Sequence, residues 1–366
     1  MVKVITIIGT RPEGIKTAML HKQLVEDSAI EAILCSTGQH TTLLQDAISD
    51  FGIQIDIQLD AMQENKTIAH QLSYMLTHLQ TVIDREKPQL IIVQGDTLSS
   101  YSGAMLAYYN KIKLAHIEAG LRTYDKLSPF PEEIHRKYID DVADYHFAHS
   151  ESARQTLLND GHITDHVYMV GNTGIDALLY INEQLQQGKL LPSEDIKQIV
   201  DNLLGQKIGL LTMHRRETMG MAQVDILERI LDCADTLGIK IICPKHPNPD
   251  LQNTYDKFKD NPQIIFIDPL DYKSMVWLMS QVDIIYSDSG GIQEEAPYLG
   301  KRVVILRELT ERQEMTDMGN HVLYSKDSLM EDTKRIVSEA ELSSSPYGEG
   351  QTSKKIIEAL KKVIAP

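Results

Sequence analysis

The sequence predicts an α/β protein built from two doubly wound domains. Short apolar, β-branched runs alternate with longer helical patterns along the chain, which is typical of parallel sheets with right-handed crossovers. The chain has 366 residues, and this length favours two domains. The eleven apolar runs also suit two sheets better than one very wide sheet.

Six strands are expected in the first half and five in the second, because apolar runs of this length fit strands buried on both faces. The first six are residues 4–8, 32–36, 90–93, 114–117, 145–148 and 167–170. The others are residues 208–213, 239–243, 264–267, 282–286 and 303–306. Ligands of such sheets bind outside the carboxyl ends of the strands.

A polar helical segment followed by Pro192 and Ser193 places the domain boundary between Gly171 and Gln206. We assign residues 1–175 to a first Rossmann-like domain and residues 176–350 to a second. The amphipathic segment at residues 351–366 is expected to form a helix that packs back on the first domain.

The composition of the chain limits the classes of partner that we expect it to bind. The formal net charge is -16, and nucleic acid or an anionic membrane would require a basic face. Local basic clusters still allow an anionic small substrate. Cys35, Cys233 and Cys243 have no metal-binding spacing, which favours a reduced, cytoplasmic protein without a disulfide framework or zinc site. We expect no signal peptide and no membrane span.

The first strand ends in a turn that suits an anion. Pro12 fits the first position of a helix, so Arg11 and Lys16 lie at or just after the amino end of that helix, where negative charge is favoured. An ordinary turn with a solvated arginine is an equally good interpretation. The GxGxxG fingerprint of dinucleotide binding is absent here.

Three carboxylates follow strands of the first domain: Asp96, Glu118 and Glu132. Each has a simpler explanation, since acids often cap helices or complement the helix dipole. Yet all three belong to loops at the carboxyl edge of one predicted sheet. Carboxylates that converge favour the protonated form of one of them, which is how a general acid is made.

The second half contains two phosphate signals. His214, Arg215 and Arg216 follow a strand and suit a diphosphate, while Arg312 offers one more cation. Ser289, Gly290 and Gly291 join a buried strand to a helix, and such a turn brings backbone N–H groups to the helix start. An acid one turn later, Glu294 or Glu295, can accept both ribose hydroxyls. We predict no metal site, because HExxH and Cys/His clusters are absent from the sequence.

These segments together resemble the non-hydrolysing UDP-N-acetylglucosamine 2-epimerase family. The motifs are GTRPE, QGDT, HIEAGLRT, PFPEE, GNTGIDAL, TMHRRE, HPNP, DSGGIQEEAP and TER, in the family's order between Gly9 and Arg312. The resemblance implies a GT-B architecture with the active site in the interdomain cleft. It also implies elimination of UDP to 2-acetamidoglucal and re-addition with inversion at carbon 2, with no cofactor and no metal.

The same resemblance implies roles for individual residues. Asp96, Glu118 and Glu132 would transfer protons, and His214 would act near the leaving phosphate. Glu295 would bind the ribose hydroxyls. The remaining predicted substrate- and UDP-binding residues are Arg11, Lys16, Arg136, Arg215, His246, Ser289, Gly290, Gly291 and Arg312.

Some positions depart from the family pattern. Bacterial members bind a second, activating UDP-N-acetylglucosamine, and the corresponding allosteric positions here are Gln39, Thr42 and Lys66. Thr42 and Lys66 replace the usual residues. His135 stands where asparagine is usual, and Gly174 follows the GNT sequence, which could signal a modified sugar substrate.

The reaction expected is therefore reversible conversion of UDP-N-acetylglucosamine to UDP-N-acetylmannosamine, for cell-surface polysaccharide precursors. The alternatives are a 2-epimerase of a modified UDP-N-acetylhexosamine, a hydrolysing epimerase, a GT-B UDP-sugar glycosyltransferase and a non-catalytic sensor. Three buried acids near a diphosphate disfavour a sensor, because burying them has no benefit for binding alone. The family resemblance also implies a homodimer.

Overall fold

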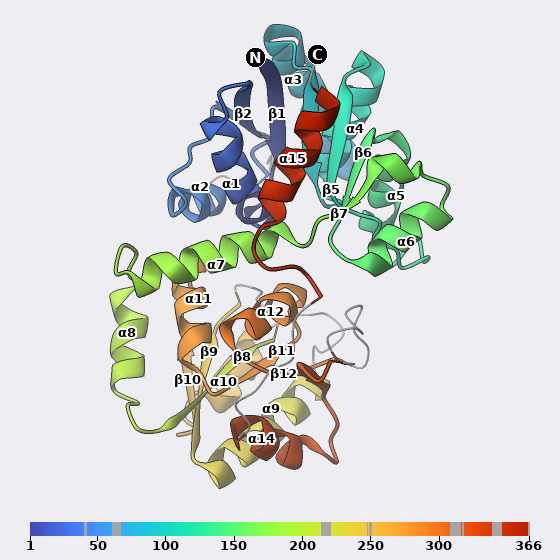
Figure 1. Cartoon of the computed structure of the whole chain (residues 1–366). Helices are drawn as coiled ribbons and strands as arrows, with labels where there is room; N and C mark the ends of the chain where they lie inside the picture. The colour runs from blue at the N-terminus through green and yellow to red at the C-terminus, as the bar shows by residue number, and fades with distance from the viewer. Residues whose placement is uncertain are drawn as a thin grey trace. The chain divides into compact units, whose positions relative to one another are not determined.

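The chain divides into two compact units, and each is described here by itself (Figure 1). The computed structural model describes residues 1–39, 42–60, 67–213, 221–246, 248, 251–307, 316, 318–338 and 346–364. Unit 1 comprises Met1–Ala177 and Tyr347–Pro366, and unit 2 comprises Leu178–Pro346. The boundary near Ala177 falls inside helix α7, Thr173–Gln186.

Unit 1 contains a parallel seven-stranded sheet with the order β3-β2-β1-β4-β5-β6-β7. Its strands are β1 Val2–Ile8, β2 Ile30–Ser36, β3 Ile57–Gln58, β4 Leu90–Gln94, β5 Lys113–Ala119, β6 Tyr145–Ala148 and β7 Val167–Met169. The order reverses at β1 and β4, the kind of switch point at which ligands bind in doubly wound sheets.

Helices cover both faces of this sheet. They are α1 Arg11–Glu26, α2 Thr42–Ser49, α3 Ile68–Glu86, α4 Leu98–Asn110, α5 Glu132–Val142, α6 Glu151–Asn159 and α15 Thr352–Ile364, with a short 3-10 helix η1, Thr164–His166. Because neighbouring strand residues point to opposite faces, Ile5 packs with α3 and α4 while Val4 packs with α1 and α15.

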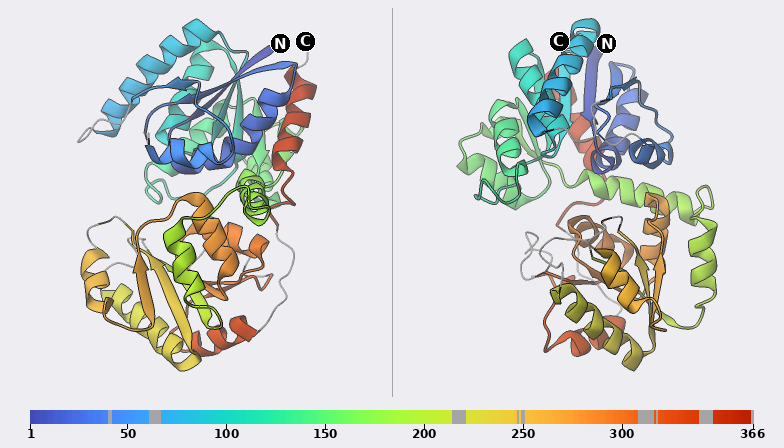
Figure 2. Two further views of the ribbon diagram at one scale, coloured as in Figure 1. Left: turned by 90° about the vertical axis from the view of Figure 1, so that its left-hand side faces the viewer. Right: turned by 180° about the vertical axis from the view of Figure 1, so that it is seen from behind.

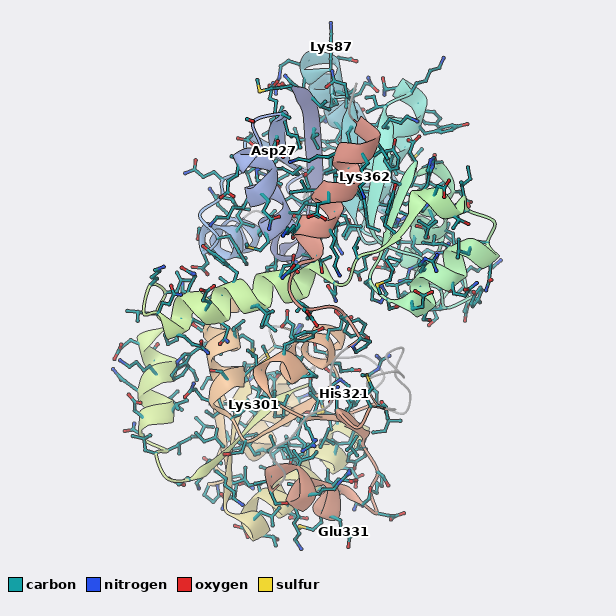
Figure 3. The ribbon with its side chains drawn as sticks, viewed as in Figure 1. Asp27, Lys87, Lys301, His321, Glu331 and Lys362 are labelled. Carbon is teal, nitrogen blue, oxygen red and sulfur yellow. The ribbon has the colours of Figure 1, made fainter. Side chains whose placement is uncertain are left out.

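The carboxyl-terminal helix α15 belongs to unit 1. It packs against α1, and its end lies beside the start of β1 in both views of Figure 2. Thr352 N and Ser353 N at its start donate to the Asp176 carboxylate. Asp27, labelled in Figure 3, forms an ion pair with Lys361 of α15. The last helix therefore completes the core of the amino-terminal unit.

Unit 2 contains a parallel six-stranded sheet with the order β10-β9-β8-β11-β12-β13. Its strands are β8 Lys207–Thr212, β9 Ile239–Pro244, β10 Ile264–Ile267, β11 Ile284–Ser287, β12 Val303–Ile305 and β13 His321–Leu323. Its helices are α8 Glu194–Asp201, α9 Met221–Leu237, α10 Gln252–Phe258, α11 Tyr272–Gln281, α12 Gly290–Glu295, the 3-10 helix η4 Ala296–Leu299 and α14 Leu329–Ser338.

The predicted two-domain α/β class is confirmed, and each of the eleven predicted strands is present. Two short strands, β3 and β13, were not predicted. Each lies at an edge of its sheet and has only two or three residues, too few for a periodic pattern. Within the described residues, no helix is long and apolar enough to cross a membrane.

Candidate active site

The turn after β1 is built around a buried carboxylate, Glu13. Thr10 is the N-cap of α1 and forms a capping box with Glu13, and a proline follows at the start of the helix. This pattern satisfies N–H groups that the first helical turn leaves unpaired. Arg11, the first residue of α1, is half-buried. The capping box and the proline therefore set the start of α1 at Arg11, the predicted anion-binding arginine.

Glu13 also joins this turn to the loop after β4. One carboxylate oxygen accepts from Gly9 N at 3.0 Å, Thr10 N at 2.7 Å and Thr10 Oγ1 at 2.8 Å. The other oxygen accepts from Thr97 Oγ1 at 2.6 Å and Ser100 Oγ at 2.9 Å. Burial raises the pKa of Glu13, although hydrogen bonds from Thr97, Thr10 and Ser100 oppose that rise.

Gly9 shows how tightly these loops pack. A Cβ atom on Gly9 would lie 1.9 Å from Ser99 Oγ and 2.5 Å from Thr37 Oγ1, closer than any side chain can approach. The turns after β1 and β4 are thus held together by the close packing of Gly9 against the Ser99 side chain and by the Glu13 carboxylate. The GTRPE motif contains both Gly9 and Glu13, but Glu13 was not predicted as a site residue. Its capping-box spacing from Thr10 was the available signal.

Glu118, a predicted proton-transfer residue, is held by a lysine and an amide at the end of β5. Lys16 Nζ lies 2.5 Å from Glu118 Oε2, and Gln94 Nε2 also donates to that oxygen. The backbone of Glu118 has φ 67, a left-handed conformation that is costly for a residue with a side chain. The pairing with β6 shifts register between Ile117 and Ala119, as at a β-bulge that redirects a side chain.

Asp96, the second predicted proton-transfer residue, is held by α5. Arg136 donates through Nη2 at 2.5 Å and through Nε at 3.0 Å to Asp96 Oδ2. The Asp96 carbonyl oxygen lies 3.0 Å from His135 Nδ1, and that imidazole stacks on Tyr101 with ring centroids 4.6 Å apart. The N-cap of α4 is Thr97. Capping of α4 therefore does not explain why an aspartate stands at position 96.

Glu132 and Glu133 begin α5 but differ in their surroundings. Glu133 is 1% exposed and accepts from Thr123 N and Tyr124 N, both at 3.0 Å. It thereby secures the loop that follows β5. Glu132, the third predicted proton-transfer residue, is half-buried. Of the two adjacent acids, the buried one holds the loop and Glu132 is the more accessible one.

Two of the three predicted proton-transfer carboxylates of unit 1 have a cation beside them. Asp96 and Glu118 follow or end the neighbouring strands β4 and β5, and they pair with Arg136 and Lys16. Side-chain exposure at these pairs ranges from 12% to 25%, so water reaches both only partly. An ion pair of this kind keeps a carboxylate oriented.

In unit 2 the described part of the predicted phosphate loop runs from β11 into α12. Thr212 Oγ1 and Ser287 Oγ lie 2.7 Å apart, and Ser289 N donates to Ser287 Oγ at 3.0 Å. Ser289 precedes Gly290, the first residue of α12. Among the described residues, a Cβ on Gly291 would meet only Ser289 Oγ, at 4.0 Å. Gly291 therefore leaves room beside a serine and a helix start, as a phosphate requires.

The predicted ribose acid, Glu295, ends α12 and is half-buried. Tyr272 Oη donates to Glu295 Oε1 at 3.0 Å, which orients the carboxylate. The helix itself is anchored by His321, labelled in Figure 3, whose Nε2 lies 2.7 Å from the Gln293 carbonyl oxygen. His246 is exposed, and its Nδ1 accepts from Asn248 N at 3.2 Å.

Several predicted residues cannot be placed. His214, Arg215, Arg312 and Lys66 lie outside the described residues. Of the predicted allosteric residues, Gln39 accepts from Ser99 Oγ at 3.1 Å, and Thr42 is the first residue of α2. Within the described part of the chain, no group of three or more His, Cys, Asp or Glu could hold a metal ion.

The two doubly wound parallel sheets, with polar residues following their strands, define a two-domain α/β enzyme of GT-B type. The family model described as UDP-N-acetylglucosamine 2-epimerase matches residues 22–361. The UDP-N-acetylglucosamine 2-epimerase of Escherichia coli strain K12 is 37% identical, with 98% of each chain covered. The chain therefore belongs to the UDP-N-acetylglucosamine 2-epimerase family, and it is an epimerase.

Solved structures agree with this assignment. The UDP-GlcNAc 2-epimerase of Neisseria meningitidis, bound to UDP-GlcNAc, has a TM-score of 0.88 and is 35% identical, over 99% of this chain and 100% of that one. The MnaA protein of S. aureus with UDP has a TM-score of 0.87 and is also 35% identical, over 100% and 97% of the two chains.

Proposed function

We propose that this protein interconverts UDP-N-acetylglucosamine and UDP-N-acetylmannosamine without hydrolysis. The observation that carries the proposal is the pair of oriented carboxylates on adjacent strands, Asp96 with Arg136 and Glu118 with Lys16. Removal of a weakly acidic proton from carbon 2 needs a positioned base, and its return to the opposite face needs a positioned acid. Binding of a UDP-sugar alone needs neither.

In the proposed reaction, a base takes the proton from carbon 2 and the bond from carbon 1 to the UDP oxygen breaks. The electron pair of the C–H bond forms the carbon 1–carbon 2 double bond of 2-acetamidoglucal, and UDP departs with the electrons of the broken C–O bond. UDP oxygen then attacks carbon 1, and a proton is delivered to the other face of carbon 2. The stereochemistry inverts and no redox cofactor is consumed.

The two units would divide this work. Asp96, Glu118 and Glu132 of unit 1 would transfer the protons, and Arg11, Lys16 and Arg136 would stabilise charge on the departing UDP. In unit 2, Ser289, Gly290 and Gly291 would bind phosphate and Glu295 the ribose. His214, Arg215, His246 and Arg312 complete the proposed set, with His214 near the leaving phosphate.

The cellular role follows from the product. UDP-N-acetylmannosamine would serve as an activated precursor of cell-surface polysaccharide. The three cysteines are free and buried, which is compatible with a cytoplasmic setting.

We further propose a homodimer formed by the helical surface of unit 1, where Tyr108 and Tyr109 of α4 are 60% and 63% exposed. Light scattering at micromolar concentration distinguishes a dimer from a monomer.

The decisive experiment is incubation of the protein with UDP-N-acetylglucosamine in deuterated water, followed by proton NMR. We expect UDP-N-acetylmannosamine with deuterium at carbon 2. Free N-acetylmannosamine with UDP would instead show a hydrolysing epimerase. Intact substrate without exchange would favour a modified UDP-N-acetylhexosamine or a glycosyltransferase, and the same assay with those sugars or an acceptor would separate them.

A further inference from the structure

His116 lies in β5, two residues before Glu118, and is fully buried. Both of its ring nitrogens have partners. Nδ1 lies 2.6 Å from Asp140 Oδ1, and Nε2 lies 2.8 Å from the carbonyl oxygen of Gly95. A carbonyl oxygen can only accept a hydrogen bond, so Nε2 must carry a proton. His116 therefore joins Asp140 to the Gly95 carbonyl oxygen.

Asp140 is held from both sides. Its first oxygen faces His116, and its second oxygen, Oδ2, accepts from Arg122 Nη1 at 2.6 Å and from Gly120 N at 3.2 Å. Burial by itself would raise the pKa of Asp140, but its contacts with His116 and Arg122 hold that pKa at about 2. Asp140 therefore joins His116 to the backbone that follows Glu118.

Arg122 continues this chain of contacts. It bridges Asp140 and Asp160, with Nη2 3.0 Å from Asp160 Oδ2. Charge-assisted contacts of this kind keep Asp140 in place beside His116. His146 of β6 also approaches, with Nε2 2.8 Å from the Asp140 carbonyl oxygen, and burial lowers the pKa of His146, which favours its neutral form.

The His116 ring is connected directly to the turn that carries Asp96. The carbonyl of Gly95 accepts from His116 Nε2, and Gly95 N donates to Ile117 O at 2.9 Å. Gly95 has φ 68, so the turn is sharp and has two bonds to β5. Asp140 also holds Gly120 N, just after Glu118. One buried network therefore supports the backbone beside two of the three predicted proton-transfer carboxylates, Asp96 and Glu118.

We propose that His116 is a positioning residue: held at Nδ1 by Asp140 and bonded through Nε2 to the Gly95 carbonyl oxygen, it fixes the Gly95 turn so that Asp96 is presented in its reactive orientation. This proposal rests on the proposed function for its effect on turnover. The restraint on the turn does not depend on the reaction. It can therefore be measured even if the protein acts on another sugar.

The first experiment is nitrogen-15 NMR of the histidine-labelled protein, with His116 assigned by loss of its signals in His116→Gln. We expect Nε2 of His116 to carry a proton, because the Gly95 carbonyl oxygen can only accept a hydrogen bond. An unprotonated Nε2 in the wild-type protein would overturn the proposal.

The second experiment compares His116→Gln with His146→Gln, its matched control. The two histidines are register partners on adjacent strands, and both are buried. We expect His116→Gln to lower kcat about 10- to 100-fold with little change in KM, since small misplacement of a reacting group has effects of this size. Amide exchange at Gly95 should accelerate. His146→Gln should leave both kcat and Gly95 exchange near the wild-type values.

The outcomes separate positioning from general stability. Wild-type kcat and unchanged Gly95 exchange in folded His116→Gln would overturn the positioning role. An equal loss of kcat in His146→Gln, with both melting temperatures lowered alike, would also contradict it. If His116→Gln does not fold, Asp140→Asn provides the same kinetic and exchange comparison. If the wild-type protein has no epimerase activity, the proposed function is wrong. The amide exchange of Gly95 then still tests whether His116 restrains the turn.

Discussion

The two units hold their predicted site residues in different ways. In unit 1, charged side chains orient one another, as in the pairs of Asp96 with Arg136 and Glu118 with Lys16. In unit 2, the described phosphate loop depends on hydroxyls, glycines and the start of a short helix, with Ser287 Oγ at its centre. The difference suggests that proton transfer requires fixed carboxylates, whereas phosphate binding requires accessible backbone N–H groups.

This comparison makes a kinetic prediction. An interaction made only in the transition state affects kcat, while one made equally in the ground state affects KM. Changes to the oriented carboxylates of unit 1 should therefore lower kcat. Changes in the unit 2 loop and its ribose acid should mainly raise KM. A single variant that behaves in the opposite way would weaken the division of labour between the two units.

The largest effect is expected for Asp96→Asn. The substitution keeps the shape of the side chain but removes a proton-transfer group, so kcat should fall about 10²- to 10⁴-fold. Binding of UDP, measured by calorimetry, should remain. Asp144→Asn is the control, because Asp144 lies at the opposite end of β5 and accepts from Leu114 N. Unchanged turnover in Asp96→Asn would remove Asp96 from the mechanism.

The next effect concerns Glu13, which connects two loops of unit 1. Glu13→Ala would leave the buried N–H groups of Gly9 and Thr10 without their acceptor, at a cost of about 2–5 kcal/mol in the free energy of unfolding. Glu13→Gln should cost much less. Its amide oxygen can accept from those N–H groups, and its NH2 group can donate to the hydroxyls of Thr97 and Ser100. Urea unfolding of both variants measures the difference.

Glu13 also makes stability depend on pH. Because burial raises its pKa in the folded state, the folded chain holds this proton more tightly than the unfolded chain. The contribution of Glu13 to the free energy of unfolding is therefore complete below its ordinary pKa and declines as pH rises through the folded value. Wild type should lose stability relative to Glu13→Gln as the pH rises above about 4, the ordinary range of a glutamate pKa. A stability difference that does not change with pH would contradict the raised pKa.

The sequence was sufficient for the eleven longer strands because a parallel strand buried on both faces is a nearly continuous apolar run, as in 90–93. It also located Asp96 and Glu118, since acids at the ends of such strands are conspicuous. It could not supply their partners: Arg136 is 40 residues from Asp96, and Lys16 is 102 residues from Glu118. Pairings over that separation are set by the strand order, which local patterns do not encode.

A smaller effect is expected in unit 2, from Glu295→Gln. If the carboxylate accepts the ribose hydroxyls, losing its charge should raise KM about 10- to 100-fold with kcat little changed, since a hydrogen bond to a charged group contributes about 1.5–3 kcal/mol. Tyr272→Phe removes only the hydroxyl that orients this carboxylate, and should raise KM less. A fall in kcat with unchanged KM would show that Glu295 acts in the transition state.

The smallest effect is expected for His135→Asn, which introduces the residue that the family resemblance implies at this position. Asparagine loses the stacking on Tyr101 and alters one hydrogen bond to the Asp96 carbonyl oxygen, so kcat should change by less than about tenfold. Burial lowers the pKa of His135, which keeps the ring neutral at pH 7. Steady-state rates of both proteins should therefore have parallel pH profiles between pH 7 and pH 9. A profile that changes shape would place His135 among the proton-transfer groups, and unit 1 would then use four such residues.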